Sequence, residues 1–221
     1  MTRRSWREAR RYVFASLAAA VVLLLARRRS SWLAFGAAGA FTIFFRDPER
    51  QLVPDERTVY AAADGVVVGV DECVSDPWLR EDDAVRISTF LSLHNVHVNR
   101  SPVAGRVTEI EEIRGGFSPA LFGRSSEGNY QNRLAIDGSA GRVVVVQVAG
   151  MLARKISCWV DTGEDVVAGQ RLGMIHLGSR TDVVVPADGV EVLVRTGDRV
   201  KAGITPLARY AEGKWARCGS T

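Results

Sequence analysis

Hydrophobic and polar positions divide the chain into two regions of different texture. The first region contains two continuous apolar runs, Tyr12–Ala26 and Trp32–Phe45, which are separated by three arginines and two serines. From Arg46 onward, short valine-rich runs alternate with glycine-containing turns, a pattern typical of β-strands. Examples of the strand-like runs are Gly65–Val70, Val85–Leu91, Arg142–Val148, Lys155–Val160, Asp182–Val185 and Glu191–Val194. We therefore expect a mainly β protein, with an apolar helical hairpin over residues 1–48 and a β-rich domain over residues 49–221.

The two apolar runs predict membrane attachment. Each run is shorter than the roughly 20 residues that a straight helix needs to cross a bilayer, although flanking arginines can reach back to the interface. We expect a hairpin, or a pair of helices lying in the membrane surface, with the β-rich domain on the cytoplasmic face of the cell membrane. A cleaved signal peptide is the alternative, but the second apolar run and the intervening arginines argue against it.

The charge distribution supports the same expectation. The formal net charge is +4, yet residues 1–50 contain ten arginines and only three acidic residues, so the rest of the chain is net negative. A nucleic-acid-binding protein would present its basic patch on the folded domain. Basic clusters beside apolar segments are instead attracted to anionic lipid head groups. The sequence therefore favours a membrane surface as partner and argues against nucleic acid.

An internal repeat refines the expected fold. The sequence TGEDVVAG is followed by an apolar strand-like segment, and TGDRVKAG is followed by another; ADGV also occurs twice. The copies begin at residues 162, 196, 63 and 187. A Gly-acidic turn, a buried valine and an Ala-Gly pair before a strand resemble the hammerhead halves of lipoyl-like barrel-sandwich folds. Such halves must interlock to bury a core, so we expect one compact barrel-sandwich-hybrid-like β domain.

The pair Gly178-Ser179, between two strand-like runs, is a candidate site of self-processing. Most Gly-Ser pairs are simple turns. However, glycine tolerates backbone conformations that other residues resist, and its carbonyl is open to attack. The Ser179 hydroxyl can attack the Gly178 carbonyl and convert the amide into an ester. Loss of the serine α-proton then eliminates the ester and leaves dehydroalanine, which hydrolyses to a pyruvoyl group. Such a serine needs a neighbouring base.

Candidate bases are few, because the chain has only three histidines, His94, His97 and His176. If the first two lie on a strand followed by a turn, their spacing places them on opposite faces. A helical turn would bring them together. A pair of polar edge residues is the simpler interpretation, and Asp64, in Ala-Asp-Gly, is by itself a typical turn residue.

Five segments together resemble a known family. They are Phe44–Pro48, Ala63–Gly65, His94–Pro102, Gly115–Ala120 and Gly178–Ser179. In this order they resemble the short branch of the phosphatidylserine decarboxylase family, and residues 129–133, NYQNR, resemble its Asn/Arg-containing segment. The resemblance extends over nearly the whole chain. It implies a proenzyme that cleaves itself between Gly178 and Ser179 into a β chain (residues 1–178) and an α chain (residues 179–221), with Ser179 becoming a covalent pyruvoyl cofactor.

The resemblance also implies residue roles. Asp64 and a histidine of the motif would assist Ser179 as a relay, and His97 matches the family histidine of the decarboxylation step. Longer members have a second histidine three residues further on, where this chain has Arg100. The choice between His94 and His97 in self-processing therefore stays open. His176 stands where a basic residue such as arginine is expected, and a structural role is the simplest for it.

The implied reaction converts phosphatidylserine into phosphatidylethanolamine. The pyruvoyl carbonyl would form a Schiff base with the serine amine of the lipid and accept the electrons released as CO₂ leaves. His97 would return a proton to the α-carbon, and Arg100 or Arg180 could pair with the lipid phosphate. No metal or diffusible cofactor is implied, and a homo-oligomer stays open.

Two other classes of protein compete with this interpretation. In a membrane-anchored zinc hydrolase, Asp64, His94 and His97 would form a partial metal site, but the chain lacks a His-x-His pair and an HExxH helix. A non-enzymatic lipoyl-like binding module would need a modifiable lysine at a hairpin tip, and none of the three lysines lies in a Met-Lys turn.

Overall fold

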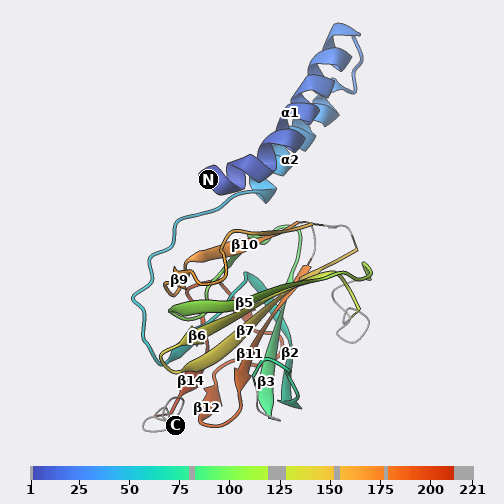
Figure 1. The fold of residues 1–221 in the computed structure, drawn as a ribbon. Helices are drawn as coiled ribbons and strands as arrows, with labels where there is room; N and C mark the ends of the chain where they lie inside the picture. Colours follow the sequence, from blue (N-terminus) through green and yellow to red (C-terminus); the bar gives the residue numbers. More distant parts are fainter. Residues whose placement is uncertain (1, 80–82, 119–127, 152–154, 177–178, 212–221) are drawn as a thin grey trace. The chain divides into compact units, whose positions relative to one another are not determined.

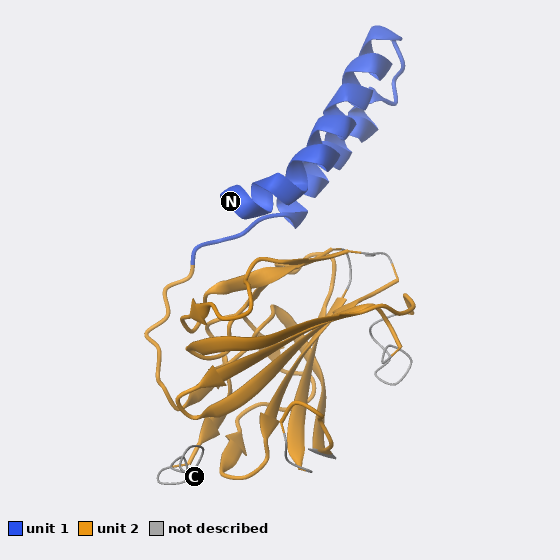
Figure 2. Ribbon diagram, in the orientation of Figure 1, with its two compact units in different colours: residues 1–49 blue, residues 50–221 orange. Residues whose placement is uncertain are grey.

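The computed structural model describes residues 2–79, 83–118, 128–151, 155–176 and 179–211 (Figure 1). It divides the chain into two compact units, Met1–Glu49 and Arg50–Thr221 (Figure 2). The first unit is helical and the second consists of β-strands.

The N-terminal unit is a pair of helices, α1 (Arg3–Leu25) and α2 (Ser31–Phe44). Tyr12 stacks on Phe41 and Phe45, with ring centroids 5.2 and 5.5 Å apart. This stacking joins the first half of α1 to the end of α2, so the helices are antiparallel. Among the described helices, neither combines the length and the apolarity that a membrane span needs.

Helix α1 begins well before the apolar run that predicted it. Its first turns contain five arginines at residues 3, 4, 7, 10 and 11, a spacing of three and four residues that gathers them along the helix surface. The helix starts at Arg3 because the Thr2 hydroxyl caps it by accepting a hydrogen bond from the Ser5 backbone N–H at 3.3 Å.

The largest element of the second unit is an eight-stranded antiparallel sheet that curls into a half-barrel (Figure 1). Its strand order is β13-β2-β3-β11-β7-β6-β5-β9. In chain order the strands are β2 (Gly65–Val74), β3 (Ala84–Leu91), β5 (Gly105–Ile113), β6 (Gln131–Gly138), β7 (Gly141–Ala149), β9 (Asp165–Val166), β11 (Ser179–Pro186) and β13 (Arg199–Val200).

Two three-stranded antiparallel sheets complete the unit. One has the order β1-β14-β12 and the other β4-β10-β8. Their strands are β1 (Thr58–Tyr60), β14 (Pro206–Tyr210), β12 (Val190–Val192), β4 (Val98–Arg100), β10 (Arg171–Ile175) and β8 (Ile156–Cys158). The prediction of a mainly β protein is confirmed.

The sequence repeat is also a structural repeat. Each copy forms a two-residue strand, a glycine turn and a longer strand, as β9 followed by β10 and as β13 followed by β14. Gly169 and Gly203 end the two copies with φ of 79° and 64°, a conformation that glycine adopts without a Cβ clash. The two turns also touch, since a Cβ on Gly203 would lie 3.0 Å from the Gly169 Cα.

The central strand β11 is buried on both faces. Val183 and Val185 belong to the main core, whereas Val184 packs with Leu79 in a second apolar cluster. Because side chains alternate along a strand, Ser179 faces the main-core side and Arg180 the opposite side. Burial on both faces explains why this strand reads as an unbroken valine run.

Candidate functional site

Ser179 is the first residue of β11, and its side chain is completely buried. It pairs with Leu91 of β3 on one side and with Ala149 of β7 on the other. Within the described part of the chain, its Oγ has no hydrogen-bond partner. Such a buried hydroxyl costs about 1–3 kcal/mol and is typical of positions kept for chemistry. Gly178, the predicted partner in cleavage, lies outside the described residues.

A row of polar side chains crosses four strands next to Ser179. Register places one residue each from β3, β11, β7 and β6 side by side: Thr89, Thr181, Gln147 and Asn132. All four are buried. The next row inward is entirely apolar and consists of Ile87, Val183, Val145 and Leu134. Ser179 therefore lies at the polar end of a core that is otherwise apolar.

Asn99 on β4 joins this row from the smaller sheet. Its Nδ2 donates to Thr181 Oγ1 at 3.0 Å and to the Ala62 carbonyl at 3.3 Å. Its Oδ1 accepts from Gln147 Nε2 at 2.7 Å, and Gln147 Oε1 accepts from Asn132 Nδ2 at 2.8 Å. Sequence reasoning missed this network, although Gln147 interrupts a valine run and was the available signal.

His97 is completely buried directly before β4. Its Nδ1 lies 3.0 Å from the carbonyl oxygen of Asn95. A carbonyl can only accept, so Nδ1 carries a proton and Nε2 is the basic nitrogen of the neutral ring. The His97 carbonyl also accepts from the backbone N–H of Ile175 at 3.2 Å. Since β10 ends at Ile175, His97 lies beside the chain four residues before Ser179.

His94 lies in a different environment. It is exposed in the turn that follows β3, where Ser92 Oγ lies 3.2 Å from its Nδ1. The backbone N–H of Asn95 closes this turn by donating to the Ser92 carbonyl at 2.8 Å. Both histidines lie between β3 and β4, His94 exposed in the turn and His97 buried directly before β4.

Asp64 is held by an arginine that sequence reasoning did not single out. Arg50 donates to both carboxylate oxygens at 2.7 Å, with side chains that are only 8% and 13% exposed. The backbone of Ala202 completes the arrangement, because its N–H donates to Asp64 at 2.8 Å and its carbonyl accepts from Arg50 at 2.5 Å. A bidentate pair of this kind fixes the orientation of the carboxylate.

The two arginines predicted to bind lipid phosphate are both buried. Arg100 donates to the Gly169 carbonyl at 2.9 Å. Arg180 pairs with Asp182, with Nε 2.9 Å from Oδ1, on the face of β11 opposite to Ser179. Burial raises the pKa of Asp182, and the Arg180 charge opposes that rise. The phosphate-binding role stays a prediction for both arginines.

His176 and a possible metal site were two further questions raised by the sequence. His176 is buried, with Nε2 3.4 Å from Ser157 Oγ, and its structural role stays a prediction. Across the ranges that the structure describes, no cluster of three or more His, Cys, Asp or Glu side chains is arranged to hold a metal ion.

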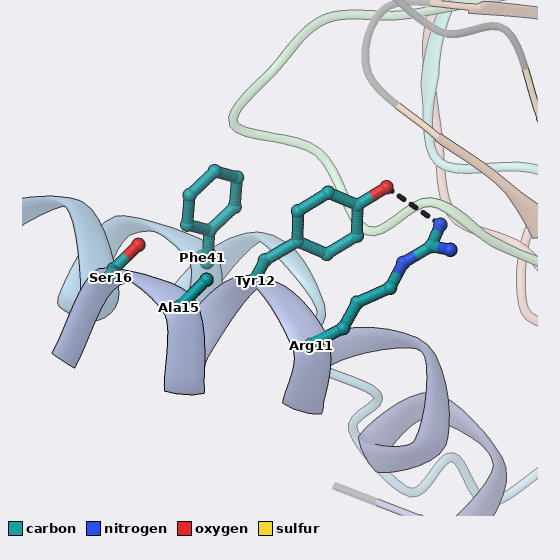
Figure 3. Close-up of a pocket in the computed structure, with 5 residues that line it drawn as sticks. All are labelled: Arg11, Tyr12, Ala15, Ser16 and Phe41. Atoms are coloured by element: carbon teal, nitrogen blue, oxygen red, sulfur yellow. Dashed lines mark hydrogen bonds between the residues drawn. The ribbon is translucent and has the colours of Figure 1, made fainter. Parts of the chain in front are cut away.

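A separate hollow lies on the helical unit (Figure 3). Its volume is about 540 Å³, and it is lined by Arg11, Tyr12, Ala15, Ser16 and Phe41. Arg11 donates to the Tyr12 hydroxyl at 2.8 Å, and its guanidinium lies 4.7 Å from the centre of that ring. Arginine beside an amphipathic aromatic ring is typical of the interfacial region of a membrane.

Comparison with known proteins identifies the family. The family model described as phosphatidylserine decarboxylase matches residues 37–208. Three relatives, each named phosphatidylserine decarboxylase proenzyme, come from Gluconobacter oxydans, Ruegeria pomeroyi and Carboxydothermus hydrogenoformans. The Gluconobacter relative is 45% identical over 87% of this chain and 90% of its own length. The Ruegeria relative is 39% identical over 91% of this chain and 93% of its own length. The Carboxydothermus relative is 43% identical over 75% of this chain and 78% of its own length. The chain therefore belongs to the phosphatidylserine decarboxylase family, whose members are carboxy-lyases.

Proposed function

We propose that this chain is the proenzyme of a pyruvoyl-dependent phosphatidylserine decarboxylase that cleaves itself between Gly178 and Ser179. The observation that carries the proposal is Ser179 itself. Its hydroxyl is buried without a hydrogen-bond partner among the described residues, at the polar end of the core, directly after a glycine in the sequence. The family membership and the proenzyme names of the relatives support the same reaction.

The proposed self-cleavage converts one peptide bond in three steps. Ser179 Oγ attacks the Gly178 carbonyl, and the Gly178–Ser179 amide becomes an ester with a free Ser179 amine. Removal of the Ser179 α-proton breaks the Cβ–Oγ bond, so residues 1–178 leave with a carboxylate at Gly178. The dehydroalanine left at residue 179 takes up water and releases ammonia. Residues 179–221 then begin with a pyruvoyl group.

His97 is the proposed base for these proton transfers. It is buried, and the Asn95 carbonyl holds the proton on Nδ1, so Nε2 has the lone pair that can accept a proton. Asp64 is proposed to assist, with its carboxylate oriented by Arg50. His94, in the exposed turn, is the second candidate for proton transfer.

The pyruvoyl group, formed from Ser179, would supply the electron sink for loss of CO₂ from the serine head group. The residues around it would define a site that excludes water. Leu91 and Ala149 are fully buried beside Ser179, and the row containing Thr181 supplies hydroxyl and amide groups. His97, or His94, is the proposed acid that returns a proton to the substrate carbon, with phosphatidylethanolamine as product.

The helical unit is proposed to bind the cytoplasmic face of the cell membrane, where the substrate lies. Several of its large apolar side chains are exposed, among them Trp6, Phe14, Trp32, Leu33 and Phe35. Arginines flank these side chains, as anionic head groups would require. The full chain should co-sediment with phosphatidylglycerol vesicles at low salt and stay in the supernatant at high salt. Failure to bind such vesicles at low salt would contradict the proposal.

We further propose that the β unit is a barrel-sandwich hybrid, and the two repeat copies support this description. Their second turns contact each other at Gly169 and Gly203, as hammerhead halves must. The comparisons favour the decarboxylase over the zinc hydrolase and the lipoyl-like module.

The test of the proposed function is an assay with labelled phosphatidylserine in mixed micelles. The wild-type chain should release CO₂ and form phosphatidylethanolamine. Ser179→Ala removes the nucleophile and should abolish both self-cleavage and CO₂ release while the chain stays folded. Activity in folded Ser179→Ala would contradict the proposal, because no pyruvoyl group can form from alanine.

A further inference from the structure

A buried amide, Asn99, connects the three segments that contain the proposed reacting groups. It lies on β4, two residues after His97. Its Nδ2 donates to Thr181 Oγ1 at 3.0 Å, and Thr181 lies two residues after Ser179 on the same face of β11. The same Nδ2 donates to the carbonyl of Ala62 at 3.3 Å, two residues before Asp64. One side chain is therefore bonded to the supports of both Ser179 and Asp64.

The orientation of this amide is fixed by its partners. Both N–H groups are used, one on Thr181 and one on Ala62, and Oδ1 accepts from Gln147 Nε2 at 2.7 Å. Gln147 cannot turn around, because its Oε1 accepts from Asn132 Nδ2 at 2.8 Å. A flipped Asn99 would place its NH₂ against the NH₂ of Gln147 and its oxygen against the Ala62 carbonyl.

Burial makes this network selective for one arrangement. Asn99 and Gln147 are completely inaccessible, and Thr181 and Asn132 are exposed by only 1% and 4%. Away from water, each hydrogen bond is strong and each unsatisfied group is costly, so a complete network favours one geometry over shifted alternatives. A shift of β4 against β11 would break the bonds of Asn99 to Thr181 and Gln147 together.

We propose that Asn99 is a positioning residue for self-cleavage. It holds β11, which begins at Ser179, at a fixed register against the segments of His97 and Asp64, and it acts through Thr181. This inference rests on the proposed function. It adds a residue without contact to the reacting atoms, whose loss would slow the first step, the attack by Ser179 Oγ.

The test compares three variants of the full chain made by cell-free synthesis, so that cleavage can be timed from the precursor. Thr181→Val removes the hydroxyl that accepts from Asn99, and Thr181→Ser keeps it. The matched control is Thr58→Val. Thr58 is a buried threonine on β1, and its hydroxyl donates to Asp55 at 2.7 Å. It takes no part in the hydrogen-bond network of Asn99.

Thr181→Val should slow self-cleavage at least about 10-fold, since small displacements of reacting groups have effects of that order or larger. Thr181→Ser should restore a rate near that of the wild type. Thr58→Val should cleave at the wild-type rate even if thermal melting shows a similar loss of stability. A wild-type rate in folded Thr181→Val would overturn the inference.

Hydroxylamine separates the first step from the second, because it cleaves the ester without elimination. Since the proposal places the defect before ester formation, hydroxylamine should not restore the rate of Thr181→Val. Restoration would show that the ester forms normally and would overturn the role of Asn99.

A second variant keeps the test decisive if Thr181→Val does not fold. Asn99→Leu keeps a similar volume but can neither donate to Thr181 and Ala62 nor accept from Gln147, and it should show the same slow, hydroxylamine-insensitive cleavage. Cleavage of folded Asn99→Leu at the wild-type rate would overturn the inference. A wild-type chain that never cleaves would instead refute the proposed function, so the two failures are distinguishable.

Discussion

At the scale of single residues, the site combines a nucleophilic hydroxyl that makes no hydrogen bond among the described residues with neighbouring side chains whose polar atoms are hydrogen-bonded. Ser179 Oγ is a buried hydroxyl with no hydrogen bond among the described residues, whereas the side-chain amide of Asn99 uses all its polar atoms. Asp64 is likewise held at both oxygens by Arg50. A reacting hydroxyl that is not engaged elsewhere can approach a neighbouring carbonyl, and rigid supports limit its other motions.

The first prediction concerns Arg50. Arg50→Ala would leave the buried Asp64 carboxylate without its bidentate partner, and loss of one member of a buried pair costs about 3–5 kcal/mol. Urea unfolding of a cleavage-deficient Ser179→Ala background should show this loss. The control is Arg209→Ala, which removes an exposed pair with Asp55 at 3.4 Å and should hardly change the free energy of unfolding, because solvent screens such pairs. Equal costs for the two variants would contradict the structural role of Arg50.

The residues of the candidate site could be predicted from the sequence only where they lie in a motif. Ser179, His97 and Asp64 were identified through a resemblance, and the structure buries all three. Arg50 and Asn99 were not singled out, because both partners of each contact are far apart in the sequence. Arg50 and Asp64 are 14 positions apart and Asn99 and Thr181 are 82 positions apart, and only the fold brings each pair together.

At the scale of elements, valine-rich strands were predicted and mixed strands were missed. The runs Arg142–Val148 and Asp182–Val185 correspond to β7 and β11, which are buried along most of their length. Strand β5 was not among the predicted runs because most of its residues are exposed or half-buried and several are glutamates. Strand β6 was not among them because it begins with Gln131 and Asn132. Polar residues at the site thus conceal the strands that contain them.

The repeat makes a prediction at this scale. Gly203→Ala places a Cβ where φ is +64° and the nearest atom, the Gly169 Cα, lies 3.0 Å away. The left-handed conformation alone costs about 1–2 kcal/mol, and the contact adds to it, so we expect a loss of about 2 kcal/mol or more in urea unfolding. Gly128→Ala places a Cβ with no atom of the described residues within 4 Å and should change stability by no more than about 0.5 kcal/mol. A neutral Gly203→Ala would show that the two turns are not locked together.

At the scale of the whole molecule, we propose that the two units have different tasks. The helical unit exposes apolar and basic side chains suited to a lipid surface, and the β unit buries the residues proposed to react. Helix α1 extends through the arginine-rich start, which hydropathy alone did not predict because that segment is polar. The polar row beside Ser179 required the register of four strands, which no local pattern specifies.

The central claim is that the chain cuts itself before Ser179 and converts that residue into a pyruvoyl group. Intact mass spectrometry of the purified full-length protein tests it most directly. We expect two chains, one ending at Gly178 and one covering residues 179–221. The second chain should be lighter than its encoded sequence by the difference between serine and pyruvoyl, and it should be blocked to Edman degradation. A single uncut chain, or a second chain that begins with an unmodified serine, would contradict it.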